Sequence, residues 1–246
     1  MSKYEKCLLV PDIHAPYQND VALSSLISFS KWWKPDKIFI MGDLVDFYAI
    51  SRFTKDPERA LKLQDEIDVA YEILKQIRNA NPNTPIVLIR GNHEYRLQKY
   101  LWSEAKELSS LRDLTVENLL NLKSLNIKYE GTGRLRHRGI IIKHGDVVRK
   151  FAGYSAKGEF EKSGMSGVSG HTHRAAVYYH KNASGDYAWM ECGCLCRLDA
   201  EYMEGETPNW EVGWGVGYFK LNSDRYFLEF IPFVGGKAFY QGKEFI

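Results

Sequence analysis

Histidines and carboxylates recur in five short polar blocks, and these are the side chains in this sequence that could carry chemistry. Imidazole nitrogens and carboxylate or amide oxygens are ligands for borderline-hard divalent metals. The chain has seven histidines, and five of them lie in these blocks. No cysteine belongs to a block, so the pattern indicates a metal site built from nitrogen and oxygen donors. The blocks are Asp12-Ile13-His14, Gly42-Asp43-Leu44-Val45-Asp46, Gly91-Asn92-His93-Glu94, His144-Gly145-Asp146 and Gly170-His171-Thr172-His173.

Short apolar runs precede the first three blocks and have the composition of strands buried on both faces. They are Lys6–Pro11, Lys37–Met41 and Pro85–Arg90. Each run ends in a polar loop. Because ligand sites in parallel sheets lie beyond the carboxyl ends of the strands, we expect the three loops to meet at one edge of a sheet.

Helical periodicity fills the two intervals between these runs. Asn19 and Asp20 are plausible capping residues for the first helix, and Asp56 and Pro57 open the second. The resulting order of strand, helix, strand, helix, strand implies right-handed crossovers and a parallel sheet. The segment Glu94–Leu125 contains no Gly or Pro and reads as mostly helical, so it could form a cap near the site.

The second half of the chain is predicted to be mainly β. Apolar and β-branched runs alternate there with Gly, Asn, Ser and Asp turns. We find no repeat of the kind that forms solenoids and no linker-like tract, so we expect a single domain over residues 1–246, with 94–125 as its helical cap. The predicted strands are Gly139–Lys143, Arg174–His180, Asp186–Met190, Val216–Leu221 and Arg225–Phe230.

The composition is that of a globular protein. Of the 246 residues, 44% are hydrophobic, which is enough for a sizeable core. The 33 Lys and Arg nearly balance the 31 Asp and Glu, so net charge alone does not indicate a polyanionic partner. No stretch approaches the roughly 18 apolar residues of a membrane span, and the run Cys7–Pro11 is too short for a signal-peptide core. We expect a soluble, cytoplasmic protein with no membrane partner.

The cysteines fit a reducing compartment, because Cys7 and the cluster Cys192, Cys194 and Cys196 form no framework of secreted disulfides. On an extended segment the three clustered thiols would share one face, with neighbours about 6.6 Å apart, a poor geometry for a disulfide. We interpret them as small buried strand residues. A structural zinc site would need a fourth ligand, and none lies beside them at finger-like spacing.

The five blocks, taken in order as DxH, GDxxD, GNHE, H and GHTH, resemble the calcineurin-like metallophosphoesterase superfamily. The resemblance implies an α/β/β/α sandwich of the α/β class, with two metal ions at the strand ends. Carried over by position, it implies that Asp43 bridges both ions, which in two-metal sites lie about 3.5 to 4 Å apart. The implied ligands are Asp12, His14, Asp43 and His173 for one ion, and Asp43, Asn92, His144 and His171 for the other.

The same resemblance implies a metal-dependent phosphoric ester hydrolase in which metal-bound hydroxide attacks phosphorus, without a nucleophilic side chain. His93 would be free of metal and would protonate the leaving oxygen. Asp46 would fix its tautomer and support the imidazolium. The metal could be Mn, Fe, Ni or Zn, since all accept His and carboxylate ligands, and we favour Mn.

Two arginines are candidate substrate contacts, beside Asn92. Arg90 precedes Gly91, and the resulting RGNHE run resembles that of protein Ser/Thr phosphatases, in which this arginine grips phosphate. Those enzymes usually carry an arginine after the second block, where this chain has Phe47 and Tyr48. Arg174 could be a second phosphate contact or a solvated residue at a strand end.

Two further features lie outside the blocks. Arg134, Arg136 and Arg138 alternate along one short predicted strand, which resembles a patch for a phosphate backbone. A charged edge strand that discourages aggregation uses the same residues, and we favour that interpretation. His137 and His180 match no block, and we read them as solvated residues without a role.

We therefore expect a two-metal phosphoesterase that hydrolyses a phosphomonoester or phosphodiester of a nucleotide or a nucleic-acid end. The partner would be this phosphorylated substrate. A DNA or RNA nuclease or a Ser/Thr protein phosphatase on the same site is the alternative enzyme. A metal-poor binding scaffold is the alternative that is not an enzyme, and the intact ligand set argues against it.

Overall fold

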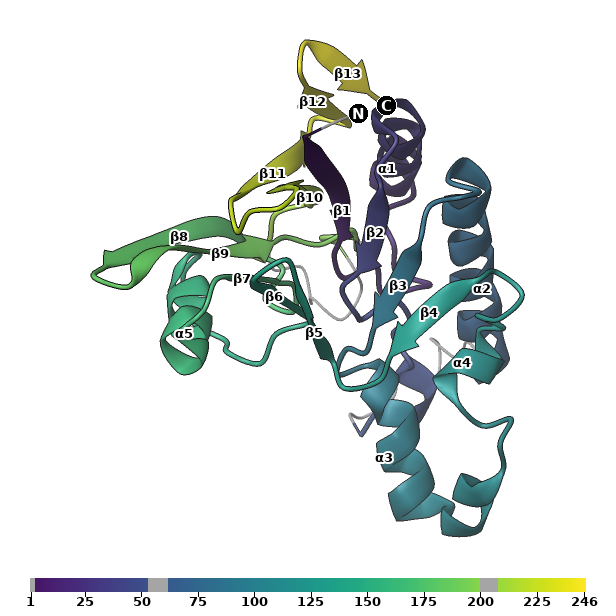
Figure 1. Ribbon diagram of the computed structural model, residues 1–246. Helices are drawn as coiled ribbons and strands as arrows, with labels where there is room; N and C mark the ends of the chain where they lie inside the picture. Colours follow the sequence, from purple (N-terminus) through teal and green to yellow (C-terminus); the bar gives the residue numbers. More distant parts are fainter. Residues whose placement is uncertain (1–2, 53–61, 200–207) are drawn as a thin grey trace.

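Two β-sheets form the centre of the protein, and helices cover their outer faces (Figure 1). The computed structural model describes residues 3–52, 62–199 and 208–246. The first sheet has the order β13 (Lys243–Phe245), β12 (Lys237–Tyr240), β11 (Tyr226–Val234), β10 (Gly213–Lys220), β1 (Tyr4–Val10), β2 (Lys37–Ile40), β3 (Ile86–Ile89) and β4 (Ile127–Glu130). The second has the order β5 (Arg134–His137), β6 (Ile140–Lys143), β7 (Gly167–Ser169), β9 (Gly185–Cys192) and β8 (Ala175–Asn182).

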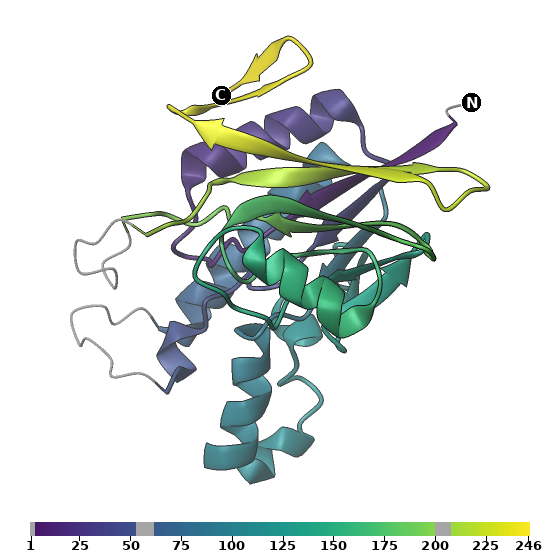
Figure 2. The same ribbon diagram turned by 90° about the vertical axis from the view of Figure 1, so that its left-hand side faces the viewer.

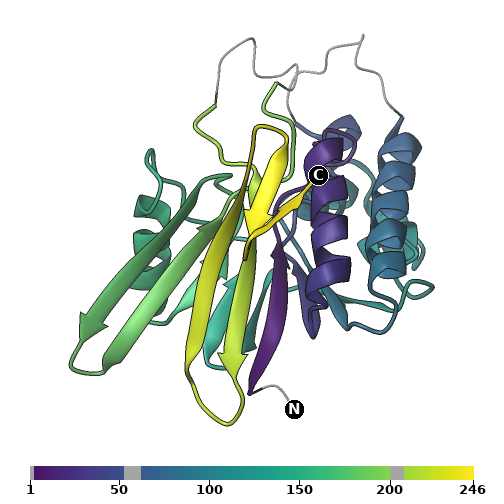
Figure 3. The ribbon, with the colours of Figure 1, turned by 90° about the horizontal axis from the view of Figure 1, so that it is seen from above.

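Helices form the two outer layers. α1 (Asp20–Trp33) and α2 (Leu63–Ala80) lie side by side on one face of the first sheet (Figure 3). α5 (Tyr154–Ser163) packs on β8 and β9 at the outer face of the second sheet (Figure 2). This arrangement confirms the predicted α/β/β/α sandwich. Within the described residues, no helix is long and apolar enough to cross a membrane.

Alternation along β1 shows how the layers pack. Leu8 and Val10 belong to the core between the first sheet and its helices. Cys7 and Leu9 point the other way, into the core between the two sheets. Successive side chains of a strand face opposite sides, so a continuous apolar run serves both cores.

The predicted parallel unit is confirmed, because β1 pairs with β2 and β2 with β3 in parallel register. α1 begins at Asp20, and the side chain of Asn19 caps it by accepting a hydrogen bond from the N–H of Ala22. The predicted start of the second helix at Asp56 and Pro57 lies outside the described residues. The carboxyl ends of β1, β2 and β3 therefore reach the same edge of the first sheet.

The second half also contains the predicted strands, now β6, β8, β9, β10 and β11. Sequence analysis missed β4, β7, α5 and the hairpin of β12 and β13. The segment 94–125 holds α3 (Glu94–Glu104), the 3-10 helix η3 (Lys106–Ser110) and α4 (Val116–Leu119). A second short 3-10 helix, η1 (Tyr48–Ile50), follows β2. That 94–125 acts as a cap stays a prediction.

The expectation that three cysteines share one strand face is wrong. Cys192 ends β9 and packs between the two sheets, whereas Cys194 and Cys196 belong to the core on the helix side. Gly193 separates them with a φ of +68°, a left-handed conformation that ends the extended segment. All four cysteines are buried, and none forms a disulfide.

The reading of His137 as a solvated residue is also wrong. Its ring packs edge-on against Phe39 and Phe219. Its Nε2 atom lies 3.0 Å from a carboxylate oxygen of Glu5. His137 faces inward because it alternates along β5 with Arg134 and Arg136, which do not share its face and are exposed. The imidazole therefore closes the edge of the core between the sheets.

Candidate metal centre

Residues from the five polar blocks meet where the strands of both sheets end. Asp12 follows β1, Asp43 follows β2 and Asn92 follows β3. The loops after β6 and β7 bring His144 and His171 to the same place, within 4.8 Å of a carboxylate oxygen of Asp43. The convergence predicted for parallel strand ends is thus present.

The first candidate ligand group contains Asp12, His14 and His173, whose ligand atoms all lie within 4.8 Å of one another. The two Nε2 atoms of His14 and His173 are 3.1 Å apart. Oδ1 of Asp12 lies 3.6 Å from Nε2 of His173. All three side chains are buried, so they are shielded from water on most sides.

The second candidate group surrounds Nε2 of His144. This atom lies 2.8 Å from Oδ1 of Asn92, 3.1 Å from Nδ1 of His171 and 3.2 Å from Oδ2 of Asp43. The same Oδ2 atom lies 3.8 Å from Nε2 of His14 in the first group. Asp43 therefore stands between the two groups, where a bridging carboxylate is required.

The Nδ1 atoms of His14 and His144, which point away from the centre, make hydrogen bonds that indicate how the two ligand groups could hold cations. Nδ1 of His14 donates to Oδ2 of Asp46 at 3.0 Å, and Nδ1 of His144 donates to the carbonyl of Met41 at 3.0 Å. In a neutral ring the opposite Nε2 atom then carries a lone pair. Both lone pairs face Oδ2 of Asp43, which lies 3.8 Å from Nε2 of His14 and 3.2 Å from Nε2 of His144, and a cation between these atoms would stabilise the arrangement. The donors suit divalent ions that accept nitrogen and oxygen ligands.

The acid–base properties of the site point the same way. Burial alone would lower the pKa of His144, but the nearby carboxylate of Asp43 outweighs it and raises the pKa to about 10. Burial would raise the pKa of Asp43, yet the imidazoles of His144 and His93 hold it well below its usual range. The clustered acceptors therefore attract positive charge strongly.

Four of the candidate ligand residues have a backbone conformation that is unfavourable for residues with a side chain. His14, Asp43, His171 and His173 have φ values of +54°, +49°, +69° and +56°. This left-handed region is costly for residues with a side chain, and such strain concentrates at functional sites. The fold therefore holds four of the seven candidate ligands in conformations that these residues would not adopt on their own.

Two glycines make room for the candidate carboxylate ligands. A Cβ atom on Gly91 would lie 2.1 Å from Oδ1 of Asp43, and one on Gly170 would lie 2.2 Å from Oδ2 of Asp12. Backbone amides next to these glycines hold the carboxylates in place. The N–H of His93 donates to Asp43 at 2.9 Å, and the N–H of His171 donates to both oxygens of Asp12 at 3.0 Å.

Glu94 fastens two of the loops together, a role that sequence analysis missed. Its buried carboxylate accepts hydrogen bonds from the N–H groups of Asp43 at 2.9 Å, Leu44 at 2.8 Å and Val45 at 3.3 Å. It also accepts one from the N–H of Gly91 at 2.7 Å. The bonds join the loop after β2 to the loop after β3, so Glu94 sets the position of Asp43.

Two further buried glutamates do the same for the remaining loops. Glu159 of α5 accepts from the N–H groups of Asp146 at 2.9 Å and Val147 at 3.1 Å. Glu191 of β9 accepts from the hydroxyl of Thr172 at 2.9 Å. Both partners are remote in sequence, so no local pattern could have revealed these roles.

His93 lies beside the centre and touches the partner that was predicted for it. Its Nδ1 donates to the main-chain oxygen of Asp46 at 2.8 Å and lies 3.4 Å from Oδ2 of that residue. The nearer acceptor is thus the carbonyl, while the carboxylate of Asp46 also binds His14. Nη2 of Arg96 donates to Nε2 of His93 at 2.8 Å. Arg96 was missed, although it follows His93 by three residues at the start of α3.

The two candidate phosphate arginines differ in their surroundings. The guanidinium of Arg90 lies 4.3 Å from the ring centroid of Tyr95, and no carboxylate pairs with it among the described residues. It lines a pocket of about 590 Å³ together with Asn92 and His144. Arg174 donates to the carbonyl of Thr172 at 3.5 Å, and its buried Nε atom has no hydrogen-bond partner in the described structure.

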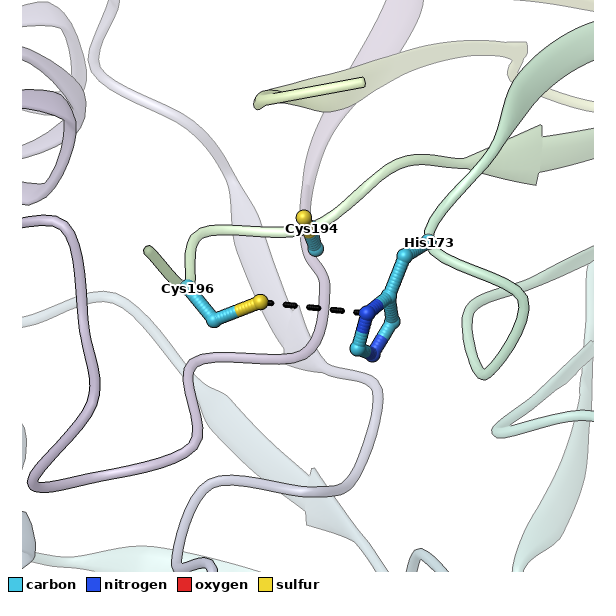
Figure 4. Close-up of side chains that lie close together, drawn as sticks. All are labelled: His173, Cys194 and Cys196. Atoms are coloured by element: carbon cyan, nitrogen blue, oxygen red, sulfur yellow. Dashed lines mark hydrogen bonds between the residues drawn. The ribbon is translucent and has the colours of Figure 1, made fainter. Parts of the chain in front are cut away.

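Cysteines adjoin the centre, which sequence analysis did not anticipate. Sγ of Cys196 points toward Nδ1 of His173 and lies 3.8 Å from it (Figure 4). Sγ of Cys194 lies within 4.8 Å of both atoms, and the described residues supply no fourth donor to this group.

Comparisons with known proteins agree with this geometry. The family model for the calcineurin-like phosphoesterase matches residues 6–175. The Gene 54 protein of Mycobacterium phage D29 is 28% identical over 250 residues, covering 96% of both chains. The Gene 54 protein of Mycobacterium phage L5 is 27% identical over 259 residues, covering 99% of this chain and 98% of the relative.

Matches to solved structures have low sequence identity. A dimetal phosphatase from Danio rerio is 10% identical, covers 92% of this chain and 95% of its own, and has a TM-score of 0.49. The phosphoesterase Yfce from E. coli is 13% identical, covers 91% of this chain and 98% of its own, and has a TM-score of 0.41.

Proposed function

The chain belongs to the calcineurin-like phosphoesterase family, and we propose that it hydrolyses a phosphomonoester or phosphodiester of a nucleotide or a nucleic-acid end. It is a metal-dependent phosphoester hydrolase. The observation that supports the proposal is the position of Asp43 between two groups of nitrogen and oxygen donors. There its carboxylate could bind two ions at once. One ion would be held by Asp12, His14, Asp43 and His173, and the other by Asp43, Asn92, His144 and His171.

When bound, two such ions lower the pKa of coordinated water and neutralise the charge of the phosphate group. Mn²⁺ is the ion that we favour, although Fe, Ni and Zn accept the same donors. The buried glutamates Glu94, Glu159 and Glu191 keep the ligand loops in place, so little reorganisation is needed when ions bind.

His93 supplies the proton for the leaving oxygen in this proposal. The carbonyl of Asp46 accepts from Nδ1 and so aims Nε2 toward the centre, 3.7 Å from Oδ2 of Asp43. Protonation at Nε2 requires Arg96 to release this atom, because a guanidinium cannot donate to a nitrogen that carries a proton. The carboxylate of Asp46, 3.4 Å from Nδ1, supports the imidazolium.

Arg90 and Arg174 are the proposed phosphate contacts, with Asn92. The guanidinium of Arg90, with which no carboxylate of the described residues pairs, lines the pocket that also reaches Asn92 and His144. A guanidinium binds phosphate through two parallel hydrogen bonds. Within the described residues the buried Nε of Arg174 has no hydrogen-bond partner, so this donor is available for a substrate oxygen. The free cysteines agree with a reducing compartment such as the cytoplasm.

A panel of substrates tests the proposal. We expect Mn²⁺-loaded protein to hydrolyse an aryl phosphate or a bis-aryl phosphodiester, with oligonucleotide substrates preferred over a phosphopeptide, and to lose activity in chelator. Preference for the phosphopeptide would favour a protein phosphatase instead. A metal-loaded protein that hydrolyses none of these esters would favour the binding scaffold.

A further inference from the structure

We propose that a nucleic-acid strand binds along β5, with Arg134 and Arg136 contacting the phosphates next to the one held at the metal centre. The inference rests on the proposed phosphoesterase function and names the substrate class that the site takes.

The position of β5 relative to the centre is the first argument. Arg134 pairs with Lys143 in the antiparallel ladder of β5 and β6, and Lys143 directly precedes the candidate ligand His144. The N–H of His144 also donates to the carbonyl of Gly133 at 3.3 Å. Arg134 therefore stands next to the metal centre, and Arg136 stands one step further away along the strand.

The faces of β5 are the second argument. Leu135 packs against the core between the sheets, and His137 fills the edge of that core. Arg134 and Arg136, which alternate with them along β5, are exposed. Alternate side chains of a strand lie about 6.6 Å apart, so Arg134 and Arg136 place two positive charges in a row that leads away from the centre.

Arg134 and Arg136 differ from the neighbouring cationic residues in their ion pairs. Lys143 and Lys162 both pair with Asp146, and Arg138 pairs with Glu5. In the described part of the chain, no carboxylate pairs with Arg134 or Arg136. The two guanidinium groups thus keep their full capacity for an anionic ligand.

The pocket beside the centre links the row to the chemistry. It has a volume of about 590 Å³ and is lined by Arg134 and Arg90 as well as by Asn92 and His144. Its lining contains four cationic and two anionic side chains, so the net charge of the lining is positive. A substrate with its ester at Asn92 and His144 would extend through this pocket onto β5. A ligand with repeated phosphates meets such a row of cations at several points, whereas a peptide with one phosphate does not.

β5 is an edge strand of the second sheet, so its arginines also suit protection against aggregation. Protection against aggregation requires charged side chains on the edge strand, but their position along the strand does not matter. It does not explain why Arg134 lines a pocket with two candidate metal ligands. The two roles predict different results when the arginines are neutralised.

The test compares Mn²⁺-loaded wild type with Arg134→Gln, Arg136→Gln and the double variant. The substrates are a bis-aryl phosphodiester, single-stranded oligonucleotides of increasing length and a phosphopeptide. We expect wild-type kcat/KM to rise with oligonucleotide length. Each variant should lower the ratio of oligonucleotide to bis-aryl kcat/KM by about threefold to tenfold. The slope of log KM against log salt should become shallower by about 0.7 per arginine lost. Lys181→Gln removes one exposed charge from β8 and is the matched control, for which the ratio should not change.

Three results would overturn the inference while the proposed function stands. In the first, the wild type hydrolyses the bis-aryl ester but its kcat/KM for oligonucleotides does not rise with their length. In the second, the variants keep the wild-type ratio of oligonucleotide to bis-aryl kcat/KM and instead self-associate. In the third, the variants lose activity on the phosphopeptide alone. The absence of hydrolysis of every ester would instead refute the proposed function. Melting temperatures of the variants show that a changed ratio does not reflect unfolding.

Discussion

The Nδ1 atom of His173 lies 3.8 Å from Sγ of Cys196, so a thiol is the outer partner of a candidate metal ligand. The corresponding nitrogens of His14 and His144 bind a carboxylate oxygen and a backbone carbonyl. A thiol is a weak acceptor compared with either. The outer partner of a ligating histidine fixes its tautomer and raises its basicity, so His173 has a weaker outer partner than His14 or His144.

Cys196→Ala should therefore weaken metal binding. Loss of an outer partner typically costs 10- to 100-fold in affinity, and for a weak acceptor we expect about 10-fold. Competition with a chelator measures the affinity without relying on turnover. Cys192→Ala is the control, because Cys192 is equally buried but contacts the carbonyl of Leu9 instead. Equal losses in the two variants would show that packing, not the contact with His173, matters.

Glu94→Gln should loosen the centre and destabilise the fold. An amide has a single acceptor oxygen, so N–H groups that now donate to both carboxylate oxygens would lose a partner. Each buried donor left unsatisfied costs about 1 to 3 kcal/mol. Urea denaturation should show a lower free energy of unfolding and chelator competition a lower metal affinity. The exposed Glu104→Gln on the same helix should change neither, and a stable Glu94→Gln with normal metal affinity would refute the role.

Glu66 should make stability depend on pH. Its buried carboxyl accepts from the N–H groups of Tyr48 and Ala49, each at 2.9 Å, and burial raises its pKa to about 7. An unfolded glutamate ionises near pH 4.3. The folded state therefore holds the proton more tightly, and the stability from this group is present in acid and is lost as pH rises from about 4 to 7.

Urea unfolding at pH 5 and pH 8 measures this effect in wild type and Glu66→Gln. The variant lacks the titrating group, so the wild type should lose more stability between the two pH values than the variant does. If the free energy of unfolding changes equally in the two proteins between pH 5 and pH 8, Glu66 does not titrate in this range.

His93→Ala should keep the metals but lose turnover, because the proposed work of His93 is proton donation. Such donation contributes about 10² to 10⁴ in rate. The loss should be large for an alkyl ester and small for an aryl ester, whose leaving anion needs no proton. Steady-state kinetics on the two esters decide the matter. Equal losses, or loss of bound metal, would mean that His93 has a different role.

Local patterns were sufficient to predict that the loops after β1, β2 and β3 meet, whereas the two ligand sets followed only from the family resemblance. Asp12, Asp43 and Asn92 each follow an apolar run, and the common edge of parallel strands brings them together. The supporting groups could not be found in this way. Glu159 and Glu191 lie on α5 and β9, and only the tertiary fold brings them to loops distant in sequence. The cysteines were misread because Gly193 ends the strand, which alternation alone does not show.

The metal content of wild type and Asp43→Asn most directly tests the claim that one carboxylate joins two ion sites. Elemental analysis after loading with Mn²⁺ and removal of free metal should find two ions per wild-type chain. Asp43→Asn should retain fewer than one, since the loss of the shared carboxylate weakens both groups, whereas His171→Ala should retain one. A wild-type chain that holds no metal, or an Asp43→Asn variant that keeps both ions, would contradict the account.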